Sequence, residues 1–190
     1  DLFGRFGDEG VSIGDIAKAA KLSKGALYWH FHSKEELYLQ CLTRLHGIFN
    51  EYIFDVMRAE EDPARSILTV FVGLNRLLQD PRAQNGISGY WLIPSSSETS
   101  ALIAAQRSFE SAAVAVLTHA FKKAAIAGQL DVGADAEQFA RAVITIVEAV
   151  VLPLRHQSAG EARENLRMLA RTLFLAYSRN ENVIELTRLI

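Results

Sequence analysis

The residues of this chain best suited to bind an anion lie at the start of a short predicted helix, residues 24–30. Ser23 is a residue type that caps helix N-termini, and the third helical position is Ala26 rather than an acidic residue. An anion there meets free backbone amides and the positive end of the helix dipole without a competing carboxylate. Lys24 adds a positive charge, and Gly25 permits close approach to the backbone. This chemistry suits a phosphate group of a nucleic acid.

Three side chains farther along the same helix, Tyr28, Trp29 and His30, add hydrogen-bond donors and flat surface at the edge of a DNA groove. Lys34, at the start of the next predicted helix, is placed for a second phosphate. For any one residue, the alternative interpretation is a chance cap or an aromatic ring packed against a neighbouring helix. The group as a whole favours DNA binding. The predicted DNA-binding residues are Ser12, Lys21, Ser23, Lys24, Gly25, Ala26, Tyr28, Trp29, His30 and Lys34.

The net charge does not by itself indicate a nucleic-acid partner. The chain has 20 Lys and Arg against 22 Asp and Glu, and six of each sign lie within the first 50 residues. DNA contact must therefore depend on where individual charges lie rather than on a basic domain. The chain begins without methionine, inside a predicted helix, so we expect further residues upstream, among them a basic arm.

The anion-binding helix belongs to a predicted helix-turn-helix. Its partner is predicted at residues 13–20, and the connection Lys21-Leu22-Ser23 has the length that sets two helices at a steep angle. Such a unit is too small to fold alone, so a short helix ending at Gly7 and the helix that follows must complete its core. We predict a DNA-binding domain over residues 1–46 and a helical effector-binding and dimerisation domain over residues 47–190.

Helical periodicity dominates the chain, and no alternation of period two is long enough for a strand, so the predicted fold class is all-α. Two kinds of start signal mark the helices: a serine followed three residues later by an acid, and an aspartate followed by proline. The serine–acid pairs are Ser12 with Asp15, Ser33 with Glu36 and Ser158 with Glu161, and the aspartate–proline pairs are Asp62-Pro63 and Asp80-Pro81. The later predicted helices cover residues 34–60, 63–79, 81–92, 98–127, 135–156 and 160–179.

Several function classes are disfavoured by what the sequence lacks. No apolar run is long enough to cross a bilayer and no secretory leader is readable, so we expect a cytoplasmic protein with no membrane partner. Cys41 is the one cysteine, which rules out an internal disulfide and any Cys/His zinc spacing. No nucleophile elbow, phosphate-binding loop or dinucleotide fingerprint is present, so we expect neither an enzyme nor a bound metal or cofactor.

The N-terminal segment resembles the TetR family of bacterial regulators. The resemblance is carried by Leu2-Phe3, Gly7, Ser12-Ile13, Ile16-Ala17, Ala20, Ser23, Gly25-Ala26-Leu27-Tyr28, His30-Phe31 and Ser33-Lys34-Glu35-Glu36-Leu37. It implies a homodimer of nine-helix or ten-helix subunits, usually a repressor, whose third helix reads the major groove and whose C-terminal domain binds a small inducer. One departure is Lys21, where the family usually has glycine. If this residue needs a left-handed backbone, lysine costs about 1 kcal/mol relative to glycine.

Two C-terminal helices carry excess apolar surface at three-and-four spacing, which suits a four-helix interface between two copies of the chain. A twofold dimer also reads a near-palindromic operator, for which a single helix-turn-helix makes too few contacts. The alternative for any one residue is the core of its own subunit. The predicted interface residues are Phe139, Val143, Val147, Val150, Leu166, Leu169, Leu173 and Tyr177.

The middle helices supply aromatic residues with a few amides, a composition found in many small-molecule sites, although aromatics at helical spacing are more often core. Glu148 is more specific, because an unpaired carboxylate in the apolar run of residues 144–152 would be costly. It is predicted to pair with Arg155 or across the dimer, or to recognise a cationic ligand. The predicted ligand-binding residues are Phe71, Asn75, Tyr90, Trp91, Gln106, Phe109, Phe121 and Glu148.

These features predict a transcriptional regulator, and specifically a repressor that a small-molecule inducer releases from its double-stranded DNA operator. The inducer is expected to move the helix predicted at residues 34–60, which joins the two domains, and so to change the distance between two recognition helices. The alternative is a helical DNA-binding or adaptor protein without a small-molecule effector.

Overall fold

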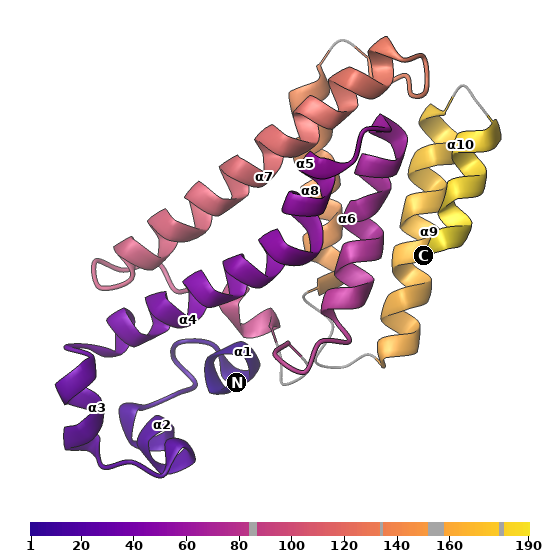
Figure 1. Ribbon diagram of the computed structural model, residues 1–190. Helices are drawn as coiled ribbons and strands as arrows, with labels where there is room; N and C mark the ends of the chain where they lie inside the picture. The colour runs from indigo at the N-terminus through magenta and orange to yellow at the C-terminus, as the bar shows by residue number, and fades with distance from the viewer. Residues whose placement is uncertain (84–86, 134, 152–157, 179–180) are drawn as a thin grey trace.

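Three short helices form the N-terminal end of the computed structural model, which describes residues 1–83, 87–133, 135–151, 158–178 and 181–190. They are α1 (Leu2–Phe6), α2 (Ile13–Ala20) and α3 (Lys24–His30). Figure 1 shows α2 and α3 beyond the lower end of α4 (Lys34–Phe49), apart from the longer helices. We call residues 1–33 the N-terminal unit. The predicted bounds of α2 and α3, and the short helix before Gly7, are confirmed.

The rest of the chain forms a helical body. After α4 come the π-helical turn η1 (Asn50–Phe54), α5 (Asp55–Ala59), α6 (Pro63–Leu77), the 3-10 turn η2 (Ser88–Trp91), α7 (Ser100–Ile126), α8 (Ala136–Val151), α9 (Ala159–Tyr177), α10 (Glu181–Glu185) and the 3-10 turn η4 (Leu186–Leu189). The two long diagonal helices of Figure 1, α4 and α7, lie side by side. The described residues contain an isolated bridge between Leu130 and Ser178 but no strand, so the all-α fold class is confirmed. None of the described helices combines the length and apolarity that a membrane crossing requires.

The predicted start signals act at four helices. At α2 and α9 the capping box is complete, with serine and acid each accepting the other's backbone N–H. At α4, Ser33 caps the N–H of Glu36 at 3.1 Å, but the Glu36 carboxylate accepts the N–H of His32 at 2.7 Å, one residue before the expected partner. Asp62 caps α6, with its carboxylate 2.8 Å from the backbone nitrogen of Arg65. Local hydrogen bonding therefore fixes these starts.

The prediction of a helix at residues 81–92 is wrong. Instead of capping a helix, the Asp80 carboxylate accepts hydrogen bonds from the Arg82 guanidinium and the Tyr52 hydroxyl, both at 2.7 Å. The bonds from Arg82 and then Tyr52 hold the pKa of Asp80 well below its usual range. Arg82 also pairs with Glu51 at 3.0 Å, so this segment is tied to η1 rather than coiled into a helix. Within the described part of the segment, η2 alone is helical.

The helix predicted at residues 34–60 is a continuous path that η1 divides into α4 and α5. The predicted end of α8, residues 152–156, lies outside the described residues. The bounds of α6, α7 and α9 differ from the predicted ones by no more than two residues, as helix ends commonly do.

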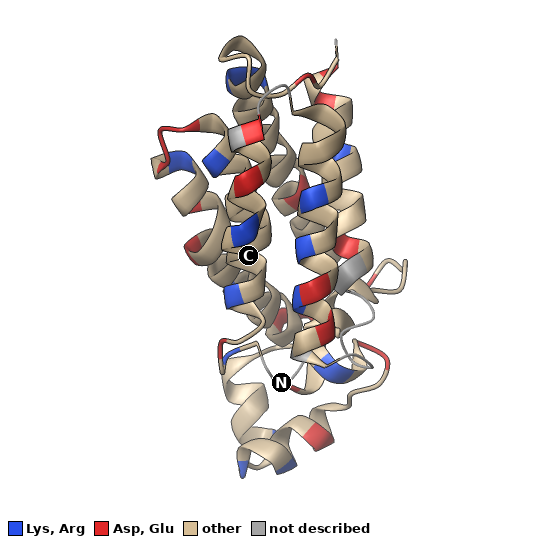
Figure 2. Cartoon of the chain, turned by 90° about the vertical axis from the view of Figure 1, so that its right-hand side faces the viewer, with Lys and Arg blue, Asp and Glu red and all other residues tan. Residues whose placement is uncertain are grey.

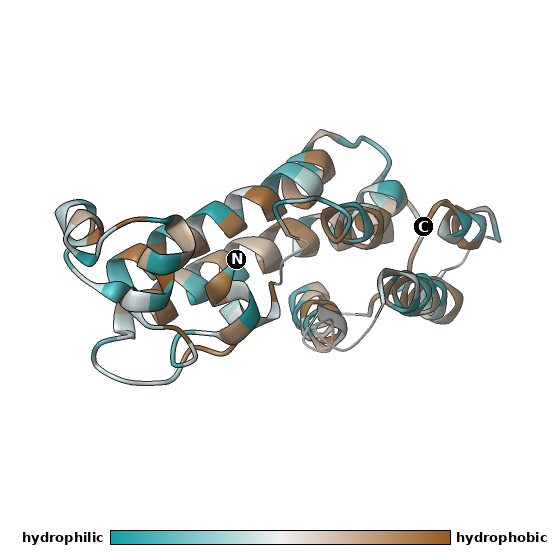
Figure 3. Ribbon diagram, turned by 90° about the horizontal axis from the view of Figure 1, so that it is seen from below, coloured by the Kyte–Doolittle hydropathy of each residue, from teal (hydrophilic) through white to brown (hydrophobic). Residues whose placement is uncertain are grey.

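Side chains of α4 anchor it in the core of the body. Viewed from below, the helices of the body carry apolar and polar faces (Figure 3). Tyr38 and Leu42 of α4 are fully buried, as are Leu74 of α6 and Leu117 of α7. Burying an apolar side chain of this size contributes about 1.5 to 3 kcal/mol. The helix that leaves the N-terminal unit is thus held firmly by the body.

Candidate DNA-binding surface and ligand site

The turn between α2 and α3 is closed by Lys21 in a left-handed conformation. Its φ and ψ are 57° and 37°, and it is the one non-glycine residue with positive φ in the described part of the chain. The N–H of Leu22 donates to the carbonyl oxygen of Ala17 at 2.9 Å, which completes the end of α2. The site therefore needs the left-handed backbone, and a lysine there carries conformational strain.

Replacing Lys21 with glycine is expected to raise the free energy of unfolding by about 1 kcal/mol, because glycine adopts this conformation without strain from a Cβ. Urea denaturation followed by circular dichroism measures the change. Lys18→Gly, in the interior of α2, is the matched control and is expected to lower the free energy of unfolding by about 1 kcal/mol. Equal effects of the two substitutions would contradict the strain at Lys21.

The start of α3 is open to an anion. The Ser23 hydroxyl accepts the N–H of Ala26 at 3.1 Å, and the first turn of α3 has no acidic residue. Lys24 and Gly25, in that first turn, are exposed. Backbone amides and the positive end of the helix dipole therefore face solvent without a competing carboxylate on the helix.

The outer face of α3 presents large aromatic rings to solvent. Trp29 is 83% exposed and Tyr28 is 52% exposed, while Leu27 is buried against the rest of the unit. Leaving such rings in water forgoes the stabilisation that their burial would give. Two adjacent exposed rings make this face a candidate surface for a binding partner.

The structure brings the predicted DNA-binding residues together at the N-terminal end of the molecule. Most are exposed: Ser12, Lys21, Ser23, Lys24, Gly25, Tyr28, Trp29 and His30; Ala26 and Lys34 are half-buried. Figure 2 shows both signs of charge at this end, in line with the balanced composition. Any affinity for DNA must come from the placement of a few groups.

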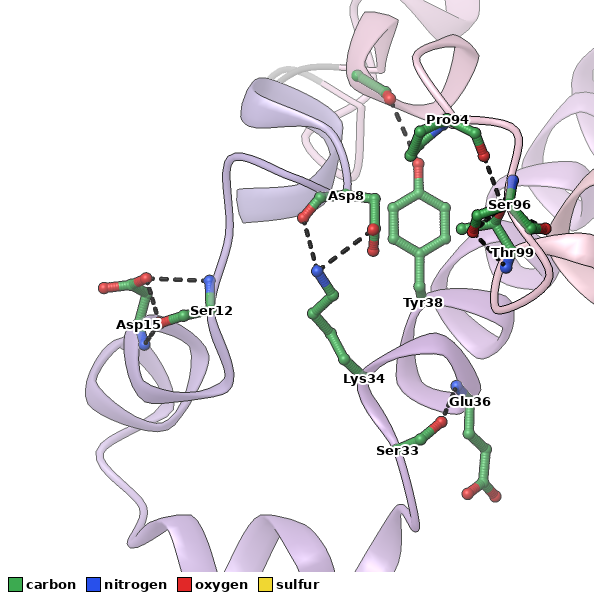
Figure 4. Close-up of polar contacts among 11 residues, drawn as sticks. Asp8, Ser12, Asp15, Ser33, Lys34, Glu36, Tyr38, Pro94, Ser96 and Thr99 are labelled. Atoms are coloured by element: carbon green, nitrogen blue, oxygen red, sulfur yellow. Dashed lines mark hydrogen bonds and ion pairs between the residues drawn. The ribbon is translucent and has the colours of Figure 1, made fainter.

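Lys34 has an internal partner that the sequence did not reveal. Its Nζ lies 3.2 Å from Oδ2 of Asp8 and donates to the Asp8 carbonyl oxygen at 3.0 Å (Figure 4). The Asp8 side chain is only 8% exposed, and its Oδ1 has no hydrogen-bond partner among the described residues. Lys34 thus neutralises a buried carboxylate and ties the segment after α1 to the start of α4. A phosphate contact by Lys34 stays a prediction, and it would compete with this ion pair.

The N-terminal unit rests on η2 of the body. A Cβ at Gly89 would overlap the carbonyl oxygen of Phe3, so the approach of the two backbones requires glycine. The Tyr38 hydroxyl donates to the Gly89 carbonyl oxygen at 3.3 Å, and its ring contacts the rings of Phe3 and Tyr90. Tyr90, predicted to bind a ligand, is 7% exposed and belongs to this junction instead.

Four of the predicted ligand-binding residues come together where α4, α7, α8 and η2 meet: Trp91, Gln106, Phe109 and Glu148. The ring of Phe49 connects them, with its centroid 5.9 Å from the Trp91 ring and 5.9 Å from the Phe109 ring. Trp91 Nε1 donates to Oε1 of Glu148 at 3.2 Å. Gln106 lies on α7 one turn before Phe109. We call Phe49, Phe54, Trp91 and Phe109 the aromatic cluster.

The turn η1 explains how two rings of one helix reach Phe109. The centroids of Phe49 and Phe54 lie 5.9 and 5.7 Å from that of Phe109. Residues five apart on an α-helix are turned by roughly 140° from each other, but the wider turn of a π-helix, with its i to i+5 bonding, brings them closer to the same face. The N–H of Asp55 bonds the carbonyl oxygen of Asn50, which is such a bond.

Histidine and carboxylate groups at the edge of the aromatic cluster have shifted pKa values. His46 stacks on Phe109 with centroids 4.0 Å apart, and its Nε2 lies 3.1 Å from Oε1 of Gln106. Burial lowers the pKa of His46, so the imidazole is uncharged at neutral pH. Burial raises the pKa of Glu148; the Trp91 bond opposes this, and the charge of Glu110 adds to it. The site combines carboxylates, rings and a neutral imidazole.

The remaining predicted ligand-binding residues lie elsewhere. Phe71 is 2% exposed, and Phe121 is fully buried with its ring against Phe139, so both belong to the core. Asn75 lies on α6 and accepts a hydrogen bond from Gln79. The sequence did not single out Phe49, Phe54, His46 or Glu110; the three-residue spacing of His46 and Phe49 was a usable signal, whereas Phe54 depends on η1.

A groove of about 300 Å³ lies between α5, the start of α6 and α7. Its lining includes Met57, Arg58, Glu60, His119 and Lys123, and none of the predicted ligand-binding residues. No three His, Cys, Asp or Glu side chains of the described residues gather closely enough to hold a metal ion.

Comparison with known families decides what the N-terminal unit is. The family described as "Bacterial regulatory proteins, tetR family" matches residues 1–41, which contain α1, α2, α3 and the first half of α4. Residues 1–41 therefore resemble the N-terminal domain of the TetR family.

Individual relatives agree with this assignment. The "Probable acrEF/envCD operon repressor" of Escherichia coli K12 is 34% identical over 86 residues, which is 42% of this chain and 39% of that protein. The matched segments span between 17% and 39% of the curated relatives' own length. A TetR transcriptional regulator from Chloroflexus aurantiacus superposes with a TM-score of 0.76 at 20% identity, over 93% of this chain and 90% of that one. AibR, crystallised with isovaleryl coenzyme A and operator DNA, gives 0.69 at 20% identity, over 91% and 92%. At this identity the likeness establishes the fold.

The dimer surface predicted from the sequence needs correction. Val143, Val147 and Leu166 are buried within the single chain, with exposures of 4%, 8% and 0%, so they are core residues with no surface left for a partner. The apolar residues do recur at helical spacing, but these three pack inside their own subunit rather than against a second copy. Of the others, Phe139, Leu169 and Leu173 are half-buried, Tyr177 is 39% exposed, and the side chain of Val150 lies outside the described residues.

Neighbouring positions on the same two helices do offer apolar surface. Ile146 on α8 is 47% exposed, and Met168 and Leu175 on α9 are 50% and 51% exposed. Exposed apolar side chains on adjacent helices commonly form the interface between helical subunits. These residues replace the buried ones as candidates for a dimer interface.

Proposed function

We propose that this chain is a DNA-binding transcriptional regulator of the TetR family, a cytoplasmic repressor that a small-molecule inducer releases from its operator, and not an enzyme. The observation that carries the proposal is the open start of α3 with Trp29 and Tyr28 exposed beside it, inside the segment that matches the family. The name of the E. coli relative, an operon repressor, supports it. AibR, of the same fold, holds operator DNA and a small molecule in one crystal, which supports the coupling of the two.

Each part of the molecule has a role in this proposal. Residues 1–46 form the DNA-binding domain, in which the α3 amides and Lys24 bind phosphate while Tyr28, Trp29 and His30 reach the groove. Residues 47–190 bind the inducer and dimerise, with Ile146, Met168 and Leu175 at the interface. A dimer places two recognition helices on two half-sites of an operator.

The inducer acts, in this proposal, at the aromatic cluster. Phe49 and Phe54 belong to the path from α4 through α5, and Trp91 ends η2, on which the N-terminal unit rests. A ligand that displaces these side chains therefore touches both connections to the N-terminal unit. It weakens operator binding only by its differential affinity for the two states, commonly about 1 to 3 kcal/mol.

The deciding experiment is fluorescence anisotropy with labelled DNA from upstream of the protein's own gene, at near-physiological salt and with excess scrambled competitor. We expect saturable binding in the nanomolar range with two chains per duplex. If this DNA binds no better than scrambled DNA and a random-sequence selection also yields no site, the proposal fails while the fold stands.

Trp29→Ala is expected to weaken operator binding about tenfold or more and to leave the free energy of unfolding within about 0.5 kcal/mol, because the ring lies in solvent until DNA covers it. Anisotropy and urea denaturation measure the two effects. Ile126→Ala, 89% exposed at the end of α7, is the matched control and should change neither. Unchanged operator affinity of Trp29→Ala would remove this residue from the DNA-binding surface.

A further inference from the structure

Glu148 carries a carboxylate into an apolar part of α8 without a counter-charge among the described residues. It is half-buried, and its described hydrogen bond comes from Trp91 Nε1 at 3.2 Å. An indole N–H donates a hydrogen bond but brings no positive charge. No Lys or Arg in the described part of the chain pairs with Glu148; Arg155, its predicted partner, lies outside that part. A charge in this position calls for a partner from elsewhere.

Glu110 brings a second negative charge towards the same place. It is half-buried on α7, and its Oε1 accepts a hydrogen bond from Gln106 Nε2 at 3.3 Å. Glu110 follows Phe109 on α7, and α7 packs against α8, which carries Glu148. The charge of Glu110 adds to the raised pKa of Glu148. The nearby His46 imidazole is neutral and does not offset them. A cation placed near both carboxylates would relieve the repulsion.

The rings of the aromatic cluster complete the site. Phe49 meets Trp91 and Phe109 edge to face, with interplanar angles of 62° and 72°. Trp91 and Phe109 are half-buried, so these two rings are not fully enclosed, and the face of an aromatic ring attracts cations. Trp91 is at once part of this wall and the donor to Glu148, so charge and ring faces lie within the reach of one small ligand.

We propose that Glu148, Glu110 and the aromatic cluster bind a small organic cation, a quaternary or protonated amine that carries an apolar group. That the cation acts as inducer rests on the proposed function; that it binds does not. An anionic ligand would meet two carboxylates, and a neutral one would leave Glu148 without a counter-charge. The apolar group belongs against the rings and the cationic centre belongs against the carboxylates.

The first test compares three ligands of similar size on the full-length protein without DNA. Phenyltrimethylammonium is the cation, tert-butylbenzene is its neutral isostere with carbon in place of nitrogen, and benzenesulfonate is the anion. Calorimetry and the fluorescence of Trp91 in a Trp29→Phe background measure the affinities. We expect the cation to bind about tenfold or more tightly than the neutral isostere, and the anion not to bind.

The second test removes the charge of Glu148 while keeping its shape. Glu148→Gln is expected to weaken binding of the cation about tenfold and to leave that of tert-butylbenzene unchanged. Glu137→Gln is the matched control, since Glu137 lies on the exposed side of α8 paired with Arg141, and it should change neither affinity. If thermal melting shows that Glu148→Gln does not fold, Glu110→Gln replaces it with the same expectation.

Each result decides. Equal affinity for cation and neutral isostere, no binding of either, or full cation affinity in both glutamine variants overturns the cation site. DNA binding is measured separately by anisotropy, so operator binding without cation preference overturns this inference alone. Cation binding without operator binding overturns the proposed function alone.

Discussion

Lys34→Ala is expected to lower the free energy of unfolding by about 2 to 3 kcal/mol, a loss much larger than that of an exposed ion pair. The substitution leaves the carboxylate of Asp8, 8% exposed, without its counter-charge. Oδ1 of Asp8 already lacks a hydrogen-bond partner among the described residues, so no hydrogen bond at Oδ1 compensates for the lost Lys34 ammonium. It also removes the bond from Nζ to the Asp8 carbonyl oxygen, which joins α1 to α4. Urea denaturation measures the loss.

The control variants separate this role from the phosphate contact predicted from the sequence. Lys24→Ala, at an exposed lysine of α3, should leave stability within about 0.5 kcal/mol. Asp8→Ala combined with Lys34→Ala should recover part of the stability, because no buried charge is left unpaired. Unchanged stability of Lys34→Ala, together with weaker binding to all DNA sequences and a flatter salt dependence, would instead establish the phosphate contact.

The parts of the structure that the sequence predicted are those that short-range interactions decide. Ser12 with Asp15 and Ser158 with Glu161 form hydrogen bonds within one turn, so the residue pattern specifies the helix start wherever the helix lies. The left-handed conformation of Lys21 was foreseen as a possibility from the glycine that the TetR family usually has there, and it too is fixed by bonds within the turn. The family signature lies in this same segment, which is why the candidate DNA-binding surface could be predicted residue by residue.

The errors arise where contacts distant in the sequence decide. Asp80 before a proline signals a helix start, yet the side chain of Tyr52, distant in the sequence, and that of nearby Arg82 bind its carboxylate, and residues 81–83 are not helical. Val143 and Ile146 belong to the same apolar pattern of α8, but Val143 is buried in the core and Ile146 is exposed. The pattern alone does not distinguish the two. No short-range pattern marks η1.

Gly89→Ala is expected to lower the free energy of unfolding by about 2 to 3 kcal/mol, because the new methyl group meets backbone that cannot rotate away. Its Cβ would overlap the Phe3 carbonyl oxygen and lie 2.8 Å from both the Gly4 carbonyl oxygen and the Gly7 nitrogen. Either α1 moves away from η2 or η2 moves away from α1. In both cases the Tyr38 bond to the Gly89 carbonyl is lost or lengthened, and the N-terminal unit shifts relative to the body.

This shift also tests how the ligand site reaches DNA. Trp91 contacts Glu148 and ends the same turn, so a Gly89→Ala protein that remains folded should bind its operator about tenfold more weakly without ligand and respond less to an inducer. Urea denaturation and operator anisotropy measure the two effects. Gly47→Ala on α4, where a Cβ meets nothing within 4 Å, is the matched control and should keep operator affinity while raising stability by up to about 1 kcal/mol. If Gly89→Ala also keeps both operator affinity and induction, η2 is not a route to the N-terminal unit, and the path from α4 through α5 must carry the response alone.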